Sequence, residues 1–112
     1  MITPEQAAQA QLDAYNARNI DAFAEVYADD VQLYSLGSDT PFCSGKEQLR
    51  ERYGAMFAQC EQLNCRLISR IICGNTAIDE ERVTGLTDGE VHAVAVYDVA
   101  DGLIRRAWFV RG

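Results

Sequence analysis

The sequence predicts one α+β domain over residues 1–112, in which three N-terminal helices pack on a strongly curved antiparallel sheet. Two observations predict this class. Apolar residues recur every three or four positions in segments before residue 61, as in helices, and every second position from residue 63 onward, as in strands. The second half is also divided into four hairpin-linked strands by three turn signals: Gly74-Asn75, Asp88-Gly89 and Asp101-Gly102.

Each helix has a recognisable start. Thr3 and Gln6 form a capping box around Pro4, so the first helix is expected to begin there. The second helix is expected to follow Asn19 and to end near residues 29–30, and a second capping box at residues 44–47 is expected to start the third. The apolar stripes of the three helices are Ala8, Leu12 and Tyr15; Ile20, Phe23, Val26 and Tyr27; and Leu49, Tyr53, Met56, Phe57 and Cys60.

The remaining elements are strands. A short one is expected over residues 31–36, and the four strands of the second half over residues 63–73, 76–87, 90–100 and 103–111. These four exceed the five or six residues of an average strand, so they are expected to twist and bend rather than lie flat. A curved sheet that is covered by helices on one face encloses a hollow.

The charge balance excludes some partners. The chain has 17 acidic and 10 basic residues and a formal charge of −7, which opposes binding to nucleic acid or to an anionic membrane surface. No uncharged apolar run approaches the ~20 residues that span a bilayer, and the first residues lack the basic-then-apolar pattern of a secretory signal. A cytoplasmic protein is therefore expected.

The spacing of the four cysteines does not indicate a metal site. No Cys-x-x-Cys pair occurs, and His92 is the only histidine, so reduced thiols are favoured over structural zinc and no cofactor is predicted. Cys65 and Cys73 share strand parity with apolar neighbours and are expected in the core, whereas Cys60 belongs to a helical stripe. Cys43 precedes a predicted helix, whose dipole lowers a thiol pKa, but no base accompanies it.

Short segments distributed along the whole chain form a recognisable set. They are Thr3-Pro4-Glu5, Asn16-Ala17 with Asp21, Ala28 to Val31, Ser44 to Tyr53, and the Asp101 to Ile104 hairpin that leads to Trp108-Phe109. Together they resemble the nuclear-transport-factor-2-like superfamily, and within it the SnoaL-like and ketosteroid-isomerase-like members. The resemblance implies a cone-shaped fold of cystatin-like topology with a pocket for a small, largely hydrophobic molecule. It implies no single reaction, because isomerases, cyclases, hydrolases, dehydratases and binding modules share this scaffold.

The resemblance does not extend to the principal residues of a steroid isomerase. That chemistry uses an aspartate base on the first strand, a tyrosine on the first helix and a protonated carboxyl group on the meander. The alignment places Ser35 or Leu36, Gln11 and Ala95 at these three positions, respectively. Only the supporting tyrosine of the third helix is kept, as Tyr53. A steroid isomerase with that mechanism is therefore not expected.

Two other carboxylates are the candidate catalytic residues. The resemblance implies that Asp79 and Glu81, two apart on one strand, face the pocket. Close carboxylates raise the pKa of one of the pair, which creates a proton-transfer group near neutral pH, and Arg111 could pair with the other. Two alternatives stay open: the strand faces the other way with Ile78 buried, or Glu81 and Arg111 form a structural ion pair without catalysis.

The implied pocket is mainly aromatic. Its lining consists of Tyr15, Tyr34, Tyr53, Phe57, Tyr97, Phe109 and Arg111. Strand parity puts His92 on the opposite face of the sheet. That face also carries an apolar set that predicts a homodimer, namely Ile78, Val94, Val96, Ile104 and Trp108. We expect a small-ligand protein with acid–base chemistry of the isomerase, lyase or hydrolase type, or alternatively a non-catalytic ligand-binding or dimerisation module.

Overall fold

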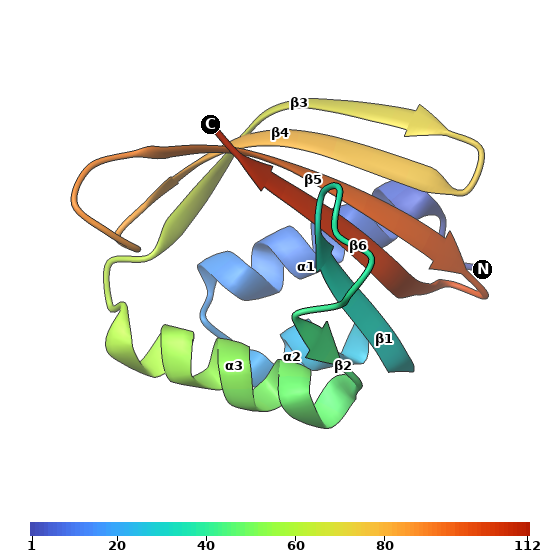
Figure 1. Ribbon diagram of the computed structural model, residues 1–112, viewed down its shortest axis with the longest axis horizontal. Coiled ribbons are helices and arrows are strands. Elements are labelled where there is room, and N and C mark those ends of the chain that lie inside the picture. Colours follow the sequence, from blue (N-terminus) through green and yellow to red (C-terminus); the bar gives the residue numbers. More distant parts are fainter.

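Three helices cover one face of a six-stranded sheet (Figure 1). The computed structural model describes all residues, 1–112. The helices are α1 (Pro4–Asn16), α2 (Ile20–Glu25) and α3 (Lys46–Gln59), and none is long and apolar enough to cross a membrane. The strands are β1 (Tyr27–Ser35), β2 (Cys43–Ser44), β3 (Asn64–Cys73), β4 (Thr76–Thr84), β5 (Val91–Ala100) and β6 (Leu103–Arg111). The predicted α+β class is confirmed.

The sheet is mixed, and it departs from the expected antiparallel sheet at one strand pair. Its strands lie in the order β2-β1-β6-β5-β4-β3, and β1 pairs with β6 in parallel while the other neighbouring pairs are antiparallel. The turn signals correctly predicted that β3, β4, β5 and β6 follow one another as hairpin-linked neighbours. β1 has no hairpin to β6, because α3 and four strands separate them along the chain. Their parallel pairing therefore left no local signal.

The two expected capping boxes have different outcomes. At α1 the Thr3 hydroxyl accepts from the Gln6 N–H at 3.1 Å, and Gln6 Oε1 accepts from the Thr3 N–H at 3.0 Å, which confirms the first box. At α3 the expected box is absent, because Ser44 lies in β2 and the N-cap is Gly45, with φ 88°. Gln48 Oε1 instead accepts from the Ser44 N–H at 2.8 Å, which links the start of α3 to the sheet edge.

Two elements end earlier than expected. α2 ends at Glu25, because Tyr27 already pairs with β6 as the first residue of β1. β4 ends at Thr84, because Gly85 has φ 81° and lies so close to the Gln62 carbonyl that a Cβ would not fit there. In both places a contact with a distant segment, rather than the local pattern, ends the element.

A β-bulge in β3 reverses which residues face the helices. The register with β4 shifts between Leu67 and Ser69, so odd-numbered residues face inward before the bulge and even-numbered residues after it. Cys65 is consequently buried, whereas Cys73 is exposed, and the expectation that Cys73 lies in the core is wrong. Arg70 lies on the inner face for the same reason, with its side chain 10% exposed.

A second register shift changes the outer face of the sheet. It follows Asp98 in the pairing of β5 with β6, and it turns Ile104 into the core, where it is fully buried. The expectation that Ile104 lies on the outer face is therefore wrong. Trp108 does lie there, stacked on Tyr34 with ring centroids 5.9 Å apart. The other partly exposed apolar residues of this face are Ile78, Val94 and Val96. A homodimer through this face stays a prediction.

The core lies between the helices and the inner sheet face, with Phe23 of α2 at the centre of an aromatic cluster. Its ring centroid is 4.8 Å from that of Tyr53 on α3 and 4.9 Å from that of Tyr27 on β1. Tyr15 of α1 and Phe57 of α3 lie at 6.2 and 5.5 Å. Four of these five rings, all except Phe57, also line a cavity.

Candidate functional site

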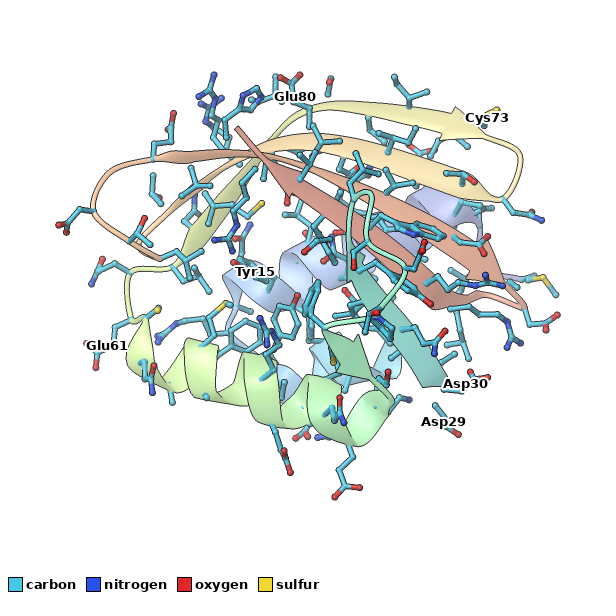
Figure 2. All side chains as sticks on the ribbon, in the orientation of Figure 1. Tyr15, Asp29, Asp30, Glu61, Cys73 and Glu80 are labelled. Atoms are coloured by element: carbon cyan, nitrogen blue, oxygen red, sulfur yellow. The ribbon has the colours of Figure 1, made fainter.

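A cavity of about 560 Å³ lies between the helices and the inner sheet face. This volume falls in the range of small-molecule sites, roughly 300–1,000 Å³. Sixteen of its 21 lining residues are hydrophobic. Figure 2 shows Tyr15 of α1 in the layer between the sheet and α3, where the cavity lies. The expected site residues that line it are Tyr15, Tyr53, Tyr97, Phe109, Arg111 and Glu81.

A small side chain on β5 leaves room for this cavity. Glu81 of β4, Ala93 of β5 and Arg111 of β6 are in register across three neighbouring strands. Since neighbouring strands lie ~5 Å apart, the backbones of Glu81 and Arg111 are roughly 10 Å apart. Ala93 lines the cavity between them with only a methyl group. The space between the acidic and the basic side chain therefore stays open.

Glu81 is the only acidic residue that lines the cavity. The residue is 9% exposed, and its Oε2 is the one buried side-chain nitrogen or oxygen atom without a hydrogen-bond partner. Burial raises the pKa of Glu81 to about 7; the Cys65 thiol and Arg70 act against this shift, and the charge of Asp79 adds to it. Near neutral pH the carboxyl group is thus divided between its protonated and ionised forms, as proton transfer requires.

Asp79 lies two residues away on the same face but has a cation of its own. It is fully buried, and Arg70 Nε and Nη2 donate to its two carboxylate oxygens at 2.7 and 3.0 Å. Arg70 Nη1 also donates to Gln9 Oε1 of α1, at 3.0 Å. Both carboxylates therefore face the interior, but Asp79 does not line the cavity. The expected partner, Arg111, pairs with neither; the bulge in β3 brings Arg70 to Asp79 instead.

Four tyrosines line the cavity beside Glu81. Burial raises the pKa of Tyr53 to about 12, and it raises the pKa values of Tyr15, Tyr27 and Tyr97 well above the usual range for tyrosine. All four hydroxyls therefore stay protonated at neutral pH and can donate hydrogen bonds. The Tyr15 hydroxyl already donates to Met56 Sδ, at 3.7 Å. An apolar cavity with neutral donors and one titrating carboxyl group suits a ligand that carries a carbonyl oxygen.

Two residues expected in the lining lie elsewhere, and their assignment to the cavity is wrong. Tyr34 lies on the outer sheet face, because it alternates along β1 with the buried Leu33. There its hydroxyl donates to Gln32 Oε1 at 2.9 Å. Phe57 is buried in the aromatic cluster, edge-on to Tyr15 with ring centroids 5.5 Å apart. It supports the cavity wall from behind.

His92 and Cys43 take no part in the cavity. His92 lies on the outer face, as its parity predicted, with Nε2 2.7 Å from Glu80 Oε2. Ser69 Oγ donates to the other oxygen of Glu80 at 3.1 Å, and Figure 2 shows Glu80 on the side of the sheet away from the helices. Cys43 is 2% exposed, and burial raises the pKa of its thiol, which opposes the expected effect of the helix dipole.

Several lining residues were not foreseen. Arg52 of α3 lines the cavity with its guanidinium carbon 4.6 Å from the centroid of the Phe42 ring. Cys65 is held beside α1 by Asn16, whose Nδ2 donates to the Cys65 carbonyl at 2.9 Å and whose Oδ1 accepts from the Cys65 N–H at 2.7 Å. Arg52 could have been predicted as a lining residue, because it lies one helical turn before Met56 and so shares that residue's side of α3. Phe42 lies between elements and carries no periodic signal.

The chain is similar to known proteins over nearly its whole length. The SnoaL-like domain model matches residues 8–107. An uncharacterised cystatin-fold protein from Novosphingobium aromaticivorans is 27% identical with a TM-score of 0.90, and the match covers 99% of this chain and 100% of that one. A SnoaL-like protein of unknown function from Burkholderia thailandensis is 20% identical with a TM-score of 0.83, over 97% and 93% of the two chains.

A third solved structure is a provisionally named ketosteroid isomerase from Kribbella flavida. It is 18% identical with a TM-score of 0.80, over 97% of this chain and 77% of that one. At this identity the likeness shows that the two proteins share a cystatin-like fold, and it shows the fold alone. No curated protein matches the chain. Because the family model extends from α1 to β6 and the solved structures share the same arrangement of helices and strands, the chain belongs to the SnoaL-like domain family.

Proposed function

We propose that this protein is a small acid–base enzyme that acts on a largely hydrophobic molecule and transfers a proton through Glu81. The unpartnered Oε2 of Glu81 carries this proposal, because it lies buried beside an apolar cavity of ligand size. A buried carboxyl group without a cation costs stability, so its retention is a common mark of a functional site. The reaction would be of the isomerase, lyase or hydrolase type.

The surroundings of Glu81 support a defined division of roles. Its ionised form would take a proton from a carbon next to a carbonyl group, and its protonated form would return a proton elsewhere on the molecule. The neutral hydroxyls of Tyr53 or Tyr15 would donate to the oxygen on which negative charge develops. Asp79 would act as a positioning residue, since Arg70 already neutralises it.

This division differs from the steroid-isomerase arrangement. Gln11, Ser35 and Leu36 line the cavity, but none is a carboxylic acid or a tyrosine, and Ala95 carries no polar group. The proposed proton-transfer group lies on β4 instead of β1. A substrate would therefore place its acidic carbon near the strand pair β4–β5.

Hydrogen–deuterium exchange tests the proposal without knowledge of the natural substrate. The probe is 2-tetralone, an aromatic ketone with acidic carbon-bound protons, followed by NMR in heavy water. The wild-type protein is expected to accelerate exchange, with a rate that rises through pH 7 as Glu81 ionises. Glu81→Gln should lower the accelerated rate by about 100-fold or more, the typical contribution of a general base.

The control is Glu80→Gln, which removes the neighbouring carboxylate on the outer face of the same strand. It should leave the exchange rate unchanged. Equal rates for wild type and Glu81→Gln would contradict the proposal, as would equal losses in both variants. The alternative, a non-catalytic ligand-binding module, predicts that 2-tetralone shifts the NMR signals of cavity residues while exchange stays at the rate of buffer.

A further inference from the structure

The two arginines at the cavity have no carboxylate partner, unlike most basic side chains of the chain. Six of the ten basic side chains are within 4.0 Å of a carboxylate, namely Lys46, Arg50, Arg66, Arg70, Arg82 and Arg105. Of the remaining four, Arg52 and Arg111 line the cavity, whereas Arg18 and Arg106 do not. The cavity thus collects half of the basic side chains that lack an ion pair, in a chain with a charge of −7.

A chain of contacts connects Arg52 to the strand that carries Arg111. Arg52 stacks on Phe42, and the Phe42 ring centroid is 6.1 Å from that of Phe109. Phe109 precedes Arg111 by two residues on β6, so the two side chains share the inner face of that strand. Both arginines also act on Tyr53, whose pKa each of them lowers. Both residues are exposed, which places their guanidinium groups at the solvent side of the cavity.

Charges are therefore distributed unequally along the cavity. The only acidic residue of the lining, Glu81, is buried, and the only two basic residues are exposed. A guanidinium group presents a planar fork of donors that matches a carboxylate. Two such forks without an internal partner, next to an aromatic cavity, form the recognition pattern of an aromatic acid.

We propose that the cavity binds an aromatic monocarboxylate, with the carboxylate held by Arg52 and Arg111 and the ring system lying over Ala93 towards Glu81. This inference adds the class of ligand to the proposed function. It rests on that function only in treating the cavity as a ligand site. The backbones of Glu81 and Arg111 are roughly 10 Å apart with only the methyl group of Ala93 between them, which leaves room for a bicyclic ring system over Ala93.

The test compares two ligands that differ in charge but hardly in shape, 2-naphthoate and 2-naphthamide. Each is titrated into the protein at low salt, and its Kd is measured from the backbone NMR signals of Ala93 and Tyr53. The naphthoate is expected to bind at least tenfold more tightly than the amide, because charge-assisted hydrogen bonds exceed neutral ones. The preference should shrink at high salt, where exposed charges are screened.

Variants identify the groups responsible. In the double variant Arg52→Gln and Arg111→Gln the ratio of the two Kd values should fall to near one, because the naphthoate loses its charge-assisted hydrogen bonds. Arg106→Gln is the matched control, because Arg106 is exposed on the same strand but outside the cavity. It should keep the full preference.

The outcomes separate the two proposals. Equal Kd values for both ligands in the wild-type protein would overturn the carboxylate inference and leave the proposed acid–base function standing. The same holds if the preference survives in the double variant. Absence of any shift at Ala93 and Tyr53 with either ligand would overturn the carboxylate inference, and the 2-tetralone exchange experiment would then test the proposed function independently.

Discussion

Asp79 and Glu81 project from the same face of β4, two residues apart, yet their surroundings are opposite. Asp79 is fully buried with both carboxylate oxygens bound by Arg70, and Glu81 is nearly as buried with Oε2 unpartnered. The difference lies in the neighbouring strand: in the β3–β4 register Arg70 stands opposite Asp79, and Leu67 stands opposite Glu81. Burial alone does not prepare a carboxylate for proton transfer; burial without a cation does.

The largest expected effect follows from removing the cation at Asp79. Arg70→Met leaves a carboxylate buried without a partner, which should destabilise the protein by about 3–5 kcal/mol. Urea unfolding at pH 7.5, followed by Trp108 fluorescence, measures this loss. The control is Arg66→Met, which removes an exposed ion pair of 4.0 Å and should cost less than about 1 kcal/mol. Equal losses in the two variants would contradict the contrast between the two carboxylates.

The second prediction concerns Glu81, whose replacement should stabilise the protein rather than destabilise it. The pKa of Glu81 is about 7 in the folded state against 4.5 for the free side chain, so the unfolded state releases its proton at lower pH. The free energy of unfolding contributed by Glu81 therefore falls as the pH rises from about 4.5 to 7 and is constant above that. At 1.36 kcal/mol for each pKa unit, the total is about 3 kcal/mol.

Glu81→Gln should remove this decline. Relative to wild type, the variant should gain stability steadily between pH 4.5 and 7 and keep the gain at pH 8, as measured by urea unfolding at each pH. Glu80→Gln is the matched comparison, because the His92 and Ser69 hydrogen bonds lower the pKa of Glu80. That variant should lose stability relative to wild type as the pH rises from acid to neutral. Parallel curves for wild type and Glu81→Gln would rule out a raised pKa at Glu81.

The smallest expected effect concerns the thiol of Cys65, which lines the cavity with Glu81. This thiol lowers the Glu81 pKa, so Cys65→Ala should move that pKa above 7. Carbon-13 NMR of the Glu81 carboxyl group during a pH titration measures the change. Cys73→Ala, at the exposed end of the same strand, should leave it unchanged. A lower Glu81 pKa in Cys65→Ala would show that the thiol does not stabilise the carboxylate.

The elements with local signals were predicted well from the sequence. The Thr3 capping box, the three hairpins of the meander and the parity of His92 all depend on residues within a few positions of one another. The inward direction of Asp79 and Glu81 came from the family resemblance, since each face of β4 mixes polar and apolar side chains. The SnoaL-like family match agrees with that resemblance.

What the sequence could not show depends on register. Single bulges in β3 and near the start of β6 exchanged the faces of Arg70, Cys73 and Ile104, and a pattern of period two does not reveal where such a shift occurs. The ion pair of Arg70 with Asp79 was missed for that reason. The parallel pairing of β1 with β6 was missed because it joins segments far apart along the chain.

Ala93 gives the site an adjustable length. It stands in register between Glu81 and Arg111, so a larger side chain at this one position would shorten the ligand that fits without moving the residue at either end. Under the two proposals above, selection for a new ligand could act on residue 93 while the proposed proton-transfer group, Glu81, and the proposed anion-binding group, Arg111, are left intact. When ligand length is set by one residue and the chemical groups by others, a single scaffold can acquire many substrates.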